Sequence, residues 1–239
     1  MAGISLRDYQ LDAVERMKNG CIPCGGVGSG KSRTALAYYY KQNGGKLGTK
    51  NYIRMPDTPK DLYIITTARK RDTLEWEGEL SPFLLSVHAE VNTYKNKVVV
   101  DSWNNIGKYA TVTDAFFIFD EQRVVGSGAW VKAFLKIAKF NEWILLSATP
   151  GDTWEDYIPV FVANGFYKNR TAFKEEHIVM TWVNGKYPKV DRYLGVGRLI
   201  RLRNRILVDM DFKRETCSHH EDVYVNYDVA KYKETSRLR

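Results

Sequence analysis

Eight consecutive residues, 25–32, have the composition of a loop that binds phosphate groups. They read Gly-Gly-Val-Gly-Ser-Gly-Lys-Ser and satisfy the pattern GxxxxGK[ST]. Glycines allow successive backbone N–H groups to point into one concavity around phosphate oxygens, while the lysine adds a cation and the serine hydroxyl can bind a magnesium ion. The sequence therefore predicts a nucleoside-triphosphate site with five contact residues, Gly25, Gly28, Gly30, Lys31 and Ser32, the last also a magnesium ligand.

Two adjacent carboxylates follow a buried apolar run further along the chain. Asp120 and Glu121 come directly after Ala115–Phe119, so they are expected at the carboxyl end of a strand, where α/β sheets bind ligands. Hydrolysis of a triphosphate requires a magnesium ion against the developing charge and a water molecule aligned for attack. We assign Asp120 to magnesium and Glu121 to the water, with Lys31 as the third catalytic residue.

The elements that must position these groups alternate along the chain. Continuous apolar runs predict strands at 21–25, 61–67, 97–100, 115–119 and 142–146, and helical patterns lie at 32–41, 70–80 and 130–139. Strands separated by helices imply crossover connections. The predicted fold is therefore α/β, with a mostly parallel sheet covered by helices on both faces. Residues 42–59 are rich in Gly, Lys, Asn and Pro and are expected to form an exposed loop.

Composition sets broad limits on the protein class. The 239 residues are 44% hydrophobic, enough for a proper core in one large domain, or in one domain with an appendage. No stretch approaches the roughly 20 apolar residues of a membrane span, and residues 1–8 lack the apolar region of a secretory signal. A cytosolic location with no membrane partner is the simplest expectation.

The cysteines and tryptophans favour packing over binding. Three cysteines give no disulfide framework. A zinc site could draw on Cys21, Cys24, Cys217, His219 and His220, but Cys21 and Cys24 lie on the strand that enters the phosphate loop, where a free cysteine commonly acts as a small buried hydrophobe. Packing is likewise favoured over base stacking for Trp76 and Trp103.

Basic residues concentrate late in the chain. The net charge of +8 favours a polyanionic partner, and six basic residues alternate with apolar ones in one segment: Arg198, Arg201, Arg203, Arg205, Lys213 and Arg214. Two interpretations remain open and compatible, an amphipathic helix with a solvated basic face and a surface that contacts phosphates.

The order of motifs resembles the superfamily 2 helicases and translocases, the DEAD/DEAH-box-like motors, and within them the Swi/Snf-like DNA translocases found also in bacteriophages. The phosphate loop, the Asp-Glu pair and Ser147-Ala148-Thr149-Pro150 occur in the family's order, and Leu6–Gln10 is similar to the motif whose glutamine reads adenine. The resemblance implies a RecA-like lobe, ATP and Mg²⁺ as cofactors, and the host cytoplasm if the gene is phage-borne.

The same resemblance implies roles for further residues. Gln10 would select ATP, with Arg7 beside it at the nucleotide, and Ser147 and Thr149 would couple hydrolysis to movement. The segment after Thr66 and the triplet Asp101-Ser102-Trp103 look like strand-contacting motifs. Candidate nucleic-acid contacts are Thr67, Arg69, Lys70, Ser102, Arg201 and Arg203, although Lys70 and Arg71 could equally mark the surface start of a basic helix.

The sequence also departs from the family. Gln122 and Arg123 replace residues that help link ATP to the strand-contacting face, which leaves the subfamily open. Family motors have two RecA-like lobes, with arginine fingers on the second, whereas one set of motifs occurs here. We expect a RecA-like lobe at 1–166 and an extension at 167–222 whose segment 191–214 resembles a helical insert. Residues 223–239 would connect to a second lobe, in cis or on a partner chain.

Three functions compete. The favoured one is the ATP-hydrolysing lobe of a translocase or helicase on nucleic acid, with duplex DNA preferred and an RNA helicase as a variant. The second is another phosphate-loop enzyme, such as a small-molecule kinase, which has no need of Gln10 or of Ser147 to Thr149. The third is a non-catalytic module that binds nucleic acid or a partner protein and hydrolyses little ATP.

Overall fold

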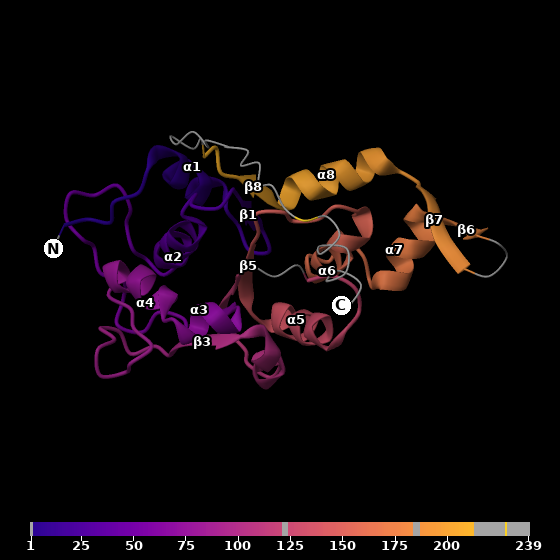
Figure 1. Ribbon diagram of the computed structural model, residues 1–239. Helices are drawn as coiled ribbons and strands as arrows, with labels where there is room; N and C mark the ends of the chain where they lie inside the picture. The colour runs from indigo at the N-terminus through magenta and orange to yellow at the C-terminus, as the bar shows by residue number, and fades with distance from the viewer. Residues whose placement is uncertain (1, 121–123, 184–186, 213–227, 229–239) are drawn as a thin grey trace.

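The computed structural model describes residues 2–120, 124–183, 187–212 and 228 (Figure 1). Outside this part of the chain lie Glu121, Gln122, Arg123 and almost all of the connector expected at 223–239. The α-helices are α1 (Asp8–Arg16), α2 (Lys31–Gln42), α3 (Ala68–Asp72), α4 (Glu75–Leu80), α5 (Ala129–Phe140), α6 (Ile158–Ala163), α7 (Arg170–His177) and α8 (Val196–Ile206). The strands are β1 (Ile22–Cys24), β2 (Leu62–Thr66), β3 (Val98–Ser102), β4 (Phe116–Asp120), β5 (Glu142–Leu146), β6 (Ile178–Val183), β7 (Tyr187–Tyr193) and β8 (Leu207–Asp209). Short 3-10 helices span Ser81–Phe83 (η1), Trp103–Tyr109 (η2) and Trp154–Tyr157 (η3).

The central strands are all parallel. One sheet has the order β3-β2-β4-β5, and β1 pairs with β8. Backbone hydrogen bonds from Leu145 N–H to Cys21 O (3.1 Å) and from Ser147 N–H to Pro23 O (3.3 Å) join β5 to β1. The strands therefore follow one another as β3-β2-β4-β5-β1-β8, and their carboxyl ends share one edge.

Helices cover both faces of this sheet, as the sequence predicts. Phe116 and Ile118 of β4 lie in one buried cluster with α1, α2 and α4, whereas Phe117 and Phe119 lie in another with α5, α6 and α8. Successive strand residues point to opposite faces, so the continuous apolar run Phe116–Phe119 serves two cores at once. In Figure 1 the line from β3 through β5 and β1 to β8 separates the two groups of helices.

The expected helix over 70–80 is two helices. α3 ends at Asp72 and α4 begins at Glu75, and Leu74 between them has a φ of 54°, in the left-handed region. Leucine rarely adopts this conformation, and nothing in the apolar spacing of the segment signals the break. The expected strand over 97–100 is also longer, since β3 runs to Ser102.

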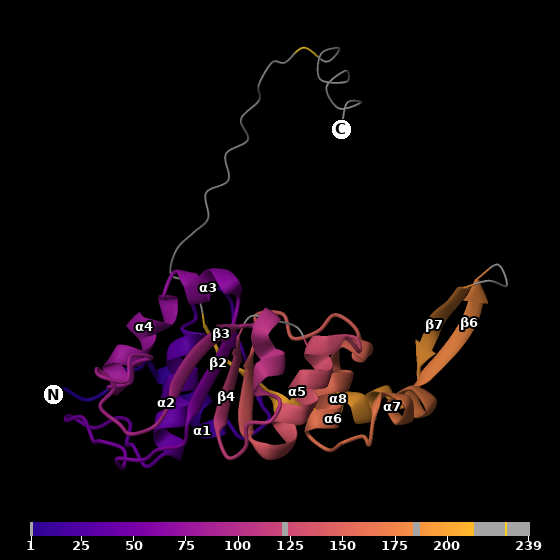
Figure 2. The ribbon, with the colours of Figure 1, turned by 90° about the horizontal axis from the view of Figure 1, so that it is seen from below.

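The extension expected after residue 166 has regular structure in its described part. Helix α7 is followed by the antiparallel hairpin β6–β7, then by α8 and β8, which returns to the main sheet beside β1. Of the helical insert expected over 191–214, residues 191–212 are described, and in them the helix spans Val196–Ile206 and is flanked by strand residues. Figure 2 shows the hairpin standing out from the body, with its strands directed toward the side on which α3 lies.

The loop between α2 and β2 is mainly exposed, as expected, and is fastened by buried residues such as Met55. In the described ranges, no helix is long and apolar enough to span a membrane.

Candidate nucleotide-binding site

The predicted phosphate loop connects β1 to the first residue of α2. Gly28 and Gly30 have φ angles of 83° and 74°, a conformation that glycine adopts without steric cost. Gly30 caps α2, so the helix and its N-terminal N–H groups begin at Lys31. The Lys31 ammonium donates hydrogen bonds to the carbonyl oxygens of Gly25 (2.6 Å) and Gly26 (3.0 Å). The loop backbone therefore folds around the Lys31 ammonium group.

A cavity of about 920 Å³ opens beside this loop. It is lined by Val27, Gly28, Gly30, Lys31, Ser32, Lys70, Glu75, Glu79, Asp120, Val125, Ser147, Ala148 and Thr149. The structure thus brings the loop, the first carboxylate and the Ser-Ala-Thr motif to one place, although Asp120 lies 88 residues and Ser147 lies 115 residues after Ser32 in the chain. Gly25 lies at the loop's edge and takes part through its carbonyl.

Asp120 ends β4 at the carboxyl edge of the sheet, as predicted, and is 1% exposed. Its Oδ2 accepts hydrogen bonds from Thr66 Oγ1 (2.8 Å) and from Lys70 Nζ (3.0 Å), and its carbonyl accepts one from the indole N–H of Trp103 (3.0 Å). Burial of a carboxylate is tolerated because these donors compensate it. Glu121 follows directly but lies outside the described residues.

Gln10 lies behind the phosphate loop and does not line the cavity. Its Nε2 donates a long hydrogen bond to Gly30 O (3.4 Å), and its Oε1 accepts one from the backbone N–H of Arg7 (2.9 Å). Tyr9 reaches the same loop, since its hydroxyl donates to Ser29 O (3.1 Å). The start of α1 therefore supports the loop through Gln10 and Tyr9, while the Arg7 side chain is exposed.

The Ser-Ala-Thr motif follows β5 and lies against β1. Ser147 Oγ accepts a hydrogen bond from the backbone N–H of Thr149 (3.1 Å). The backbone N–H of Ser147 is bonded to Pro23, just before the phosphate loop. The start of the motif is therefore joined by the backbone to the strand that leads into the phosphate loop.

The candidate nucleic-acid residues on α3 have different surroundings. Thr67 caps the helix by accepting a hydrogen bond from the N–H of Lys70 (3.3 Å), and Arg69 is exposed. The Lys70 side chain points into the cavity toward Asp120. Ser102 is 2% exposed and accepts a hydrogen bond from Arg71 (3.3 Å). Of these candidate residues, Arg69 is thus the one whose side chain is exposed to solvent.

Asp101 is the centre of a polar network that the motif alone does not reveal. Its carboxylate accepts hydrogen bonds from Asn105 (2.8 Å), Tyr109 (2.7 Å) and Arg71 (3.2 Å). Burial alone would raise the pKa of Asp101, but these donors and the backbone N–H of Ser102 outweigh it and hold the pKa below its ordinary value. The spacing of four residues from Asp101 to Asn105 is the only local signal of the network.

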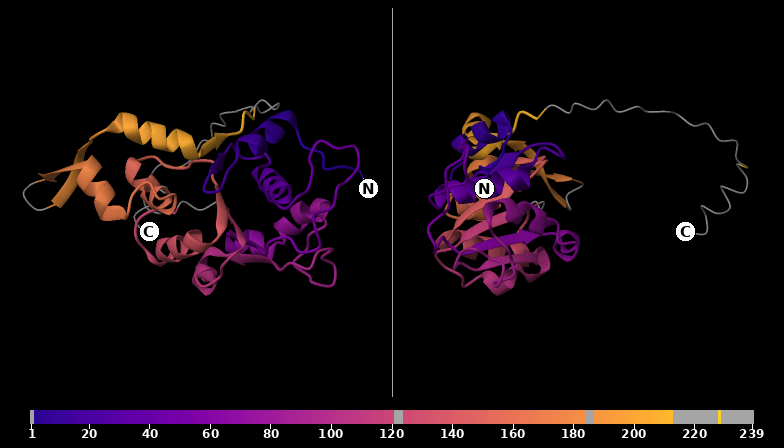
Figure 3. Two further views of the ribbon diagram at one scale, coloured as in Figure 1. Left: turned by 180° about the vertical axis from the view of Figure 1, so that it is seen from behind. Right: turned by 90° about the vertical axis from the view of Figure 1, so that its left-hand side faces the viewer.

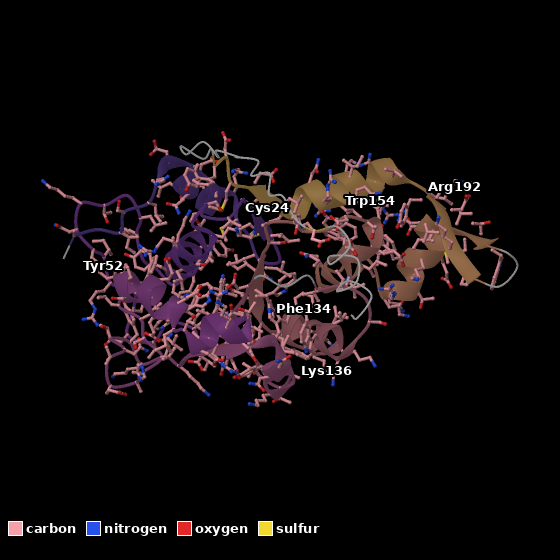
Figure 4. All side chains as sticks on the ribbon, viewed as in Figure 1. Cys24, Tyr52, Phe134, Lys136, Trp154 and Arg192 are labelled. Atoms are coloured by element: carbon pink, nitrogen blue, oxygen red, sulfur yellow. The ribbon has the colours of Figure 1, made fainter. Side chains whose placement is uncertain are left out.

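The two candidate arginines on α8 face different ways. Arg201 is exposed. The Arg203 guanidinium instead lies over the ring of Trp154, 5.4 Å from the ring centroid. Trp154 is labelled beneath α8 in Figure 4. Leu199, Leu202 and Ile206 bury the opposite side of the helix, so the amphipathic pattern is correct. The pattern could not show that Trp154 covers one of the arginines, because that contact joins distant segments.

Cys21, Trp76 and Trp103 are buried packing residues in this structure. Cys21 is fully buried, which raises the pKa of its thiol to about 12. Trp76 and Trp103 are 2% and 3% exposed and lie in the two cores. Within the described ranges, no three His, Cys, Asp or Glu residues are placed to hold a metal ion; Cys217, His219 and His220 lie beyond those ranges.

Comparison with known proteins identifies the fold. No protein-family model matches the chain, and no curated protein matches it. Among solved structures, the Sulfolobus solfataricus SWI2/SNF2 ATPase core in complex with dsDNA is similar, with a TM-score of 0.62, 15% identity, and coverage of 87% of this chain and 45% of that one. The Pyrococcus furiosus Hef helicase domain has a TM-score of 0.46, 17% identity, and coverage of 76% of this chain and 43% of that one.

The similarity to the SWI2/SNF2 core shows that the chain has a helicase-like RecA fold, in agreement with the predicted fold class. The chain spans less than half the length of either structure.

Proposed function

We propose that this chain is the ATP-binding and ATP-hydrolysing lobe of a motor that moves on nucleic acid, with duplex DNA as its preferred track. The observation that carries the proposal is the meeting in one cavity of the phosphate loop, the buried carboxylate of Asp120 and the Ser147–Thr149 motif. A kinase needs the first two of these but not the third.

The residues present fit ATP and a magnesium ion. The N–H groups around Gly28 and Gly30 and the Lys31 ammonium would hold the phosphates, and Ser32 and Asp120 would hold the metal. The cavity, at about 920 Å³, lies within the size range of small-molecule sites. Magnesium neutralises charge that develops on phosphate oxygens during transfer.

The chain's own residues would position the metal ion and the nucleotide and would activate the attacking water. Asp120, held in place by its donors, would fix the metal position, while Glu121 would polarise the attacking water. Gln10 and Arg7 would read the adenine edge from the start of α1. Ser147, tied to β1 by its backbone, would transmit the state of the phosphate loop.

We propose that a further cation completes the site. The basic side chains that line the cavity in the described ranges are Lys31 and Lys70, and no arginine lines it there. Arginine fingers accelerate related hydrolases by about 10³- to 10⁵-fold. We therefore infer that a second RecA-like lobe, in cis or on a partner chain, supplies the missing cation.

Nucleic acid is the proposed track for two reasons. The chain carries a net charge of +8, which attracts phosphate backbones, and exposed arginines such as Arg69 and Arg201 are available for contact. The structural relative with the SWI2/SNF2 fold was solved on duplex DNA; by analogy we expect the same partner here.

Steady-state ATP hydrolysis by the purified chain tests the proposal, measured alone and with duplex DNA, single-stranded DNA or RNA. Lys31→Ala serves as the blank. We expect measurable ATP binding and a low rate, because the arginine finger is not supplied. Absence of ATP binding by the wild type would overturn the proposal, and robust DNA-stimulated turnover by these 239 residues would refute the need for a second lobe.

A further inference from the structure

The hairpin β6–β7, hereafter the arm, is built for contact outside the body of the protein. It comprises residues 178–183 and 187–193 and is antiparallel, with a register shift between Val179 and Met180. Figure 3 (left) shows it projecting from one end of the molecule, beyond α7 and α8. Two-stranded ribbons of this kind bury little surface within themselves and are marginal without support.

His177 supplies that support at the base of the arm. It is 2% exposed, and its Nδ1 lies 2.7 Å from Leu194 O while its Nε2 lies 2.7 Å from the Tyr167 hydroxyl. Because a carbonyl can only accept, Nδ1 donates to Leu194 O, and Nε2 shares a hydrogen bond with the Tyr167 hydroxyl. Leu194 N–H also donates to His177 O (2.8 Å). Both ends of the arm are thus fixed to the body, and its direction is defined.

The two faces of the arm differ in chemistry. Opposite residues on paired strands point to the same side, so Met180 pairs with Val190 and Trp182 with Pro188 on one face. Met180 is 45% exposed and Trp182 is 65% exposed. Large apolar side chains this exposed on a projecting element mark an interaction surface.

The other face is basic. Thr181 pairs with Lys189, and Val179 with Arg192, and the Arg192 side chain is 67% exposed. Arg192 lies on the arm at the outer edge of the view in Figure 4. The stretch 178–206, which holds the arm and α8, contains seven basic residues and one acidic residue. Most of the chain's excess positive charge is therefore concentrated here.

We propose that the arm binds duplex DNA through its basic face, with Lys189 and Arg192 on backbone phosphates, while Trp182 and Met180 point to the other side of the ribbon. The charge of the segment complements phosphate, and the major groove, about 12 Å wide, admits a two-stranded ribbon. The arm also extends toward the side of the sheet on which α3 and its exposed Arg69 lie (Figure 2). This inference rests on the proposed nucleic-acid partner but not on hydrolysis.

Fluorescence anisotropy with a labelled duplex tests the arm, using the full chain with a non-hydrolysable ATP analogue. The test variant is Lys189→Glu/Arg192→Glu, and the matched control is Lys132→Glu/Lys136→Glu, which makes the same charge change on exposed positions of α5. We expect at least a tenfold loss of affinity in the arm variant alone. Its log-log salt slope should fall by about two, since each lost phosphate contact accounts for about one.

A second variant tests which face of the arm meets the duplex. Trp182→Ala, on the opposite face, should leave duplex affinity within about twofold of the wild type, because it removes no phosphate contact, with the salt slope unchanged. Equal binding by the wild type and Lys189→Glu/Arg192→Glu, or an equal loss in Trp182→Ala, would overturn the role of the basic face while leaving the proposed function standing. No binding of any nucleic acid by the wild type would overturn both. Loss of self-association in the arm variants, with DNA binding intact, would identify the arm as a protein-binding surface instead.

Discussion

The ammonium nitrogen of Lys70 lies 3.0 Å from Oδ2 of Asp120, inside the cavity that the phosphate loop borders. The carboxylate is 2% exposed and the lysine side chain 19% exposed, so the pair is largely withdrawn from water. The same carboxylate is the one expected to bind magnesium. If magnesium binds as proposed, Lys70 would compete with it for Asp120, and because Lys70 belongs to α3, metal binding would alter the contacts of that helix.

Lys70→Met should lower the free energy of unfolding of the nucleotide-free protein by about 1–3 kcal/mol, because a buried carboxylate loses a charged donor. Magnesium with a non-hydrolysable ATP analogue should then raise the thermal midpoint more in the variant than in the wild type, since the metal replaces the lost cation. Thermal unfolding with and without both ligands measures this. Lys132→Met on α5 is the control, and equal ligand-induced shifts in all three proteins would contradict the competition.

Lys31→Ala should abolish hydrolysis while leaving the fold intact. The hydrogen bonds of its ammonium to Gly25 and Gly26 involve backbone carbonyls at the surface of the loop, which water can satisfy after the change. Loss of a charge-assisted contact to phosphate corresponds to about 10- to 100-fold in ATP affinity. Titration of a fluorescent ATP analogue would measure the change in ATP affinity, and circular dichroism would check that the variant is folded. Unchanged ATP affinity would place the phosphates elsewhere.

Gln10→Ala should reduce the preference for ATP over GTP. Its amide is held by Arg7 and Gly30 at the edge of the phosphate loop, which fixes which of its atoms donates and which accepts. The ratio of the dissociation constants for ATP and GTP is the informative readout, because loosening of the loop would weaken the binding of both nucleotides alike. Equal binding of ATP and GTP by the wild type would count against adenine recognition by this residue.

The sequence predicted which residues meet around the phosphate loop better than it predicted the surface contacts near them, for a physical reason. Lys31 and Ser32 belong to one contiguous loop, and Asp120 ends a strand whose burial follows from the five apolar residues before it. Such local patterns need no knowledge of the fold. The break at Leu74 and the covering of Arg203 by Trp154 depend on packing between distant segments.

The arm illustrates a signal that was present but unused. Asn184-Gly185 is a dipeptide typical of tight hairpins, and β-branched and aromatic residues precede and follow it. Polar residues such as Thr181 and Lys189 interrupt the apolar pattern of a strand. The ribbon tolerates them because it projects from the body and exposes side chains on both faces.

Asp101 should make stability depend on pH in the acid range. Its folded-state pKa is lowered from a model-compound value of 3.8, so its contribution is fully present above that value and is lost as the pH falls through the folded pKa. Asp101→Asn should therefore destabilise the protein at neutral pH, and the difference from the wild type should shrink below about pH 4. Urea unfolding at a series of pH values measures it; a difference that grows on acidification would contradict the assignment.

Ser147→Ala should separate ATP hydrolysis from its stimulation by nucleic acid. The substitution keeps the backbone bond from residue 147 to Pro23 but removes the oxygen that accepts from Thr149 N–H, so the loop after β5 loses its fixed turn. ATP affinity should stay within about twofold of the wild type, because we assign the phosphates to the loop of residues 25–32. Stimulation by duplex DNA, measured with the second lobe present, should fall by about tenfold, the scale of one or two lost hydrogen bonds. Ser127→Ala, at an exposed position beyond β4, is the control. If stimulation by DNA persisted in full while basal hydrolysis fell, Ser147 would act in ATP hydrolysis itself rather than in coupling hydrolysis to nucleic acid.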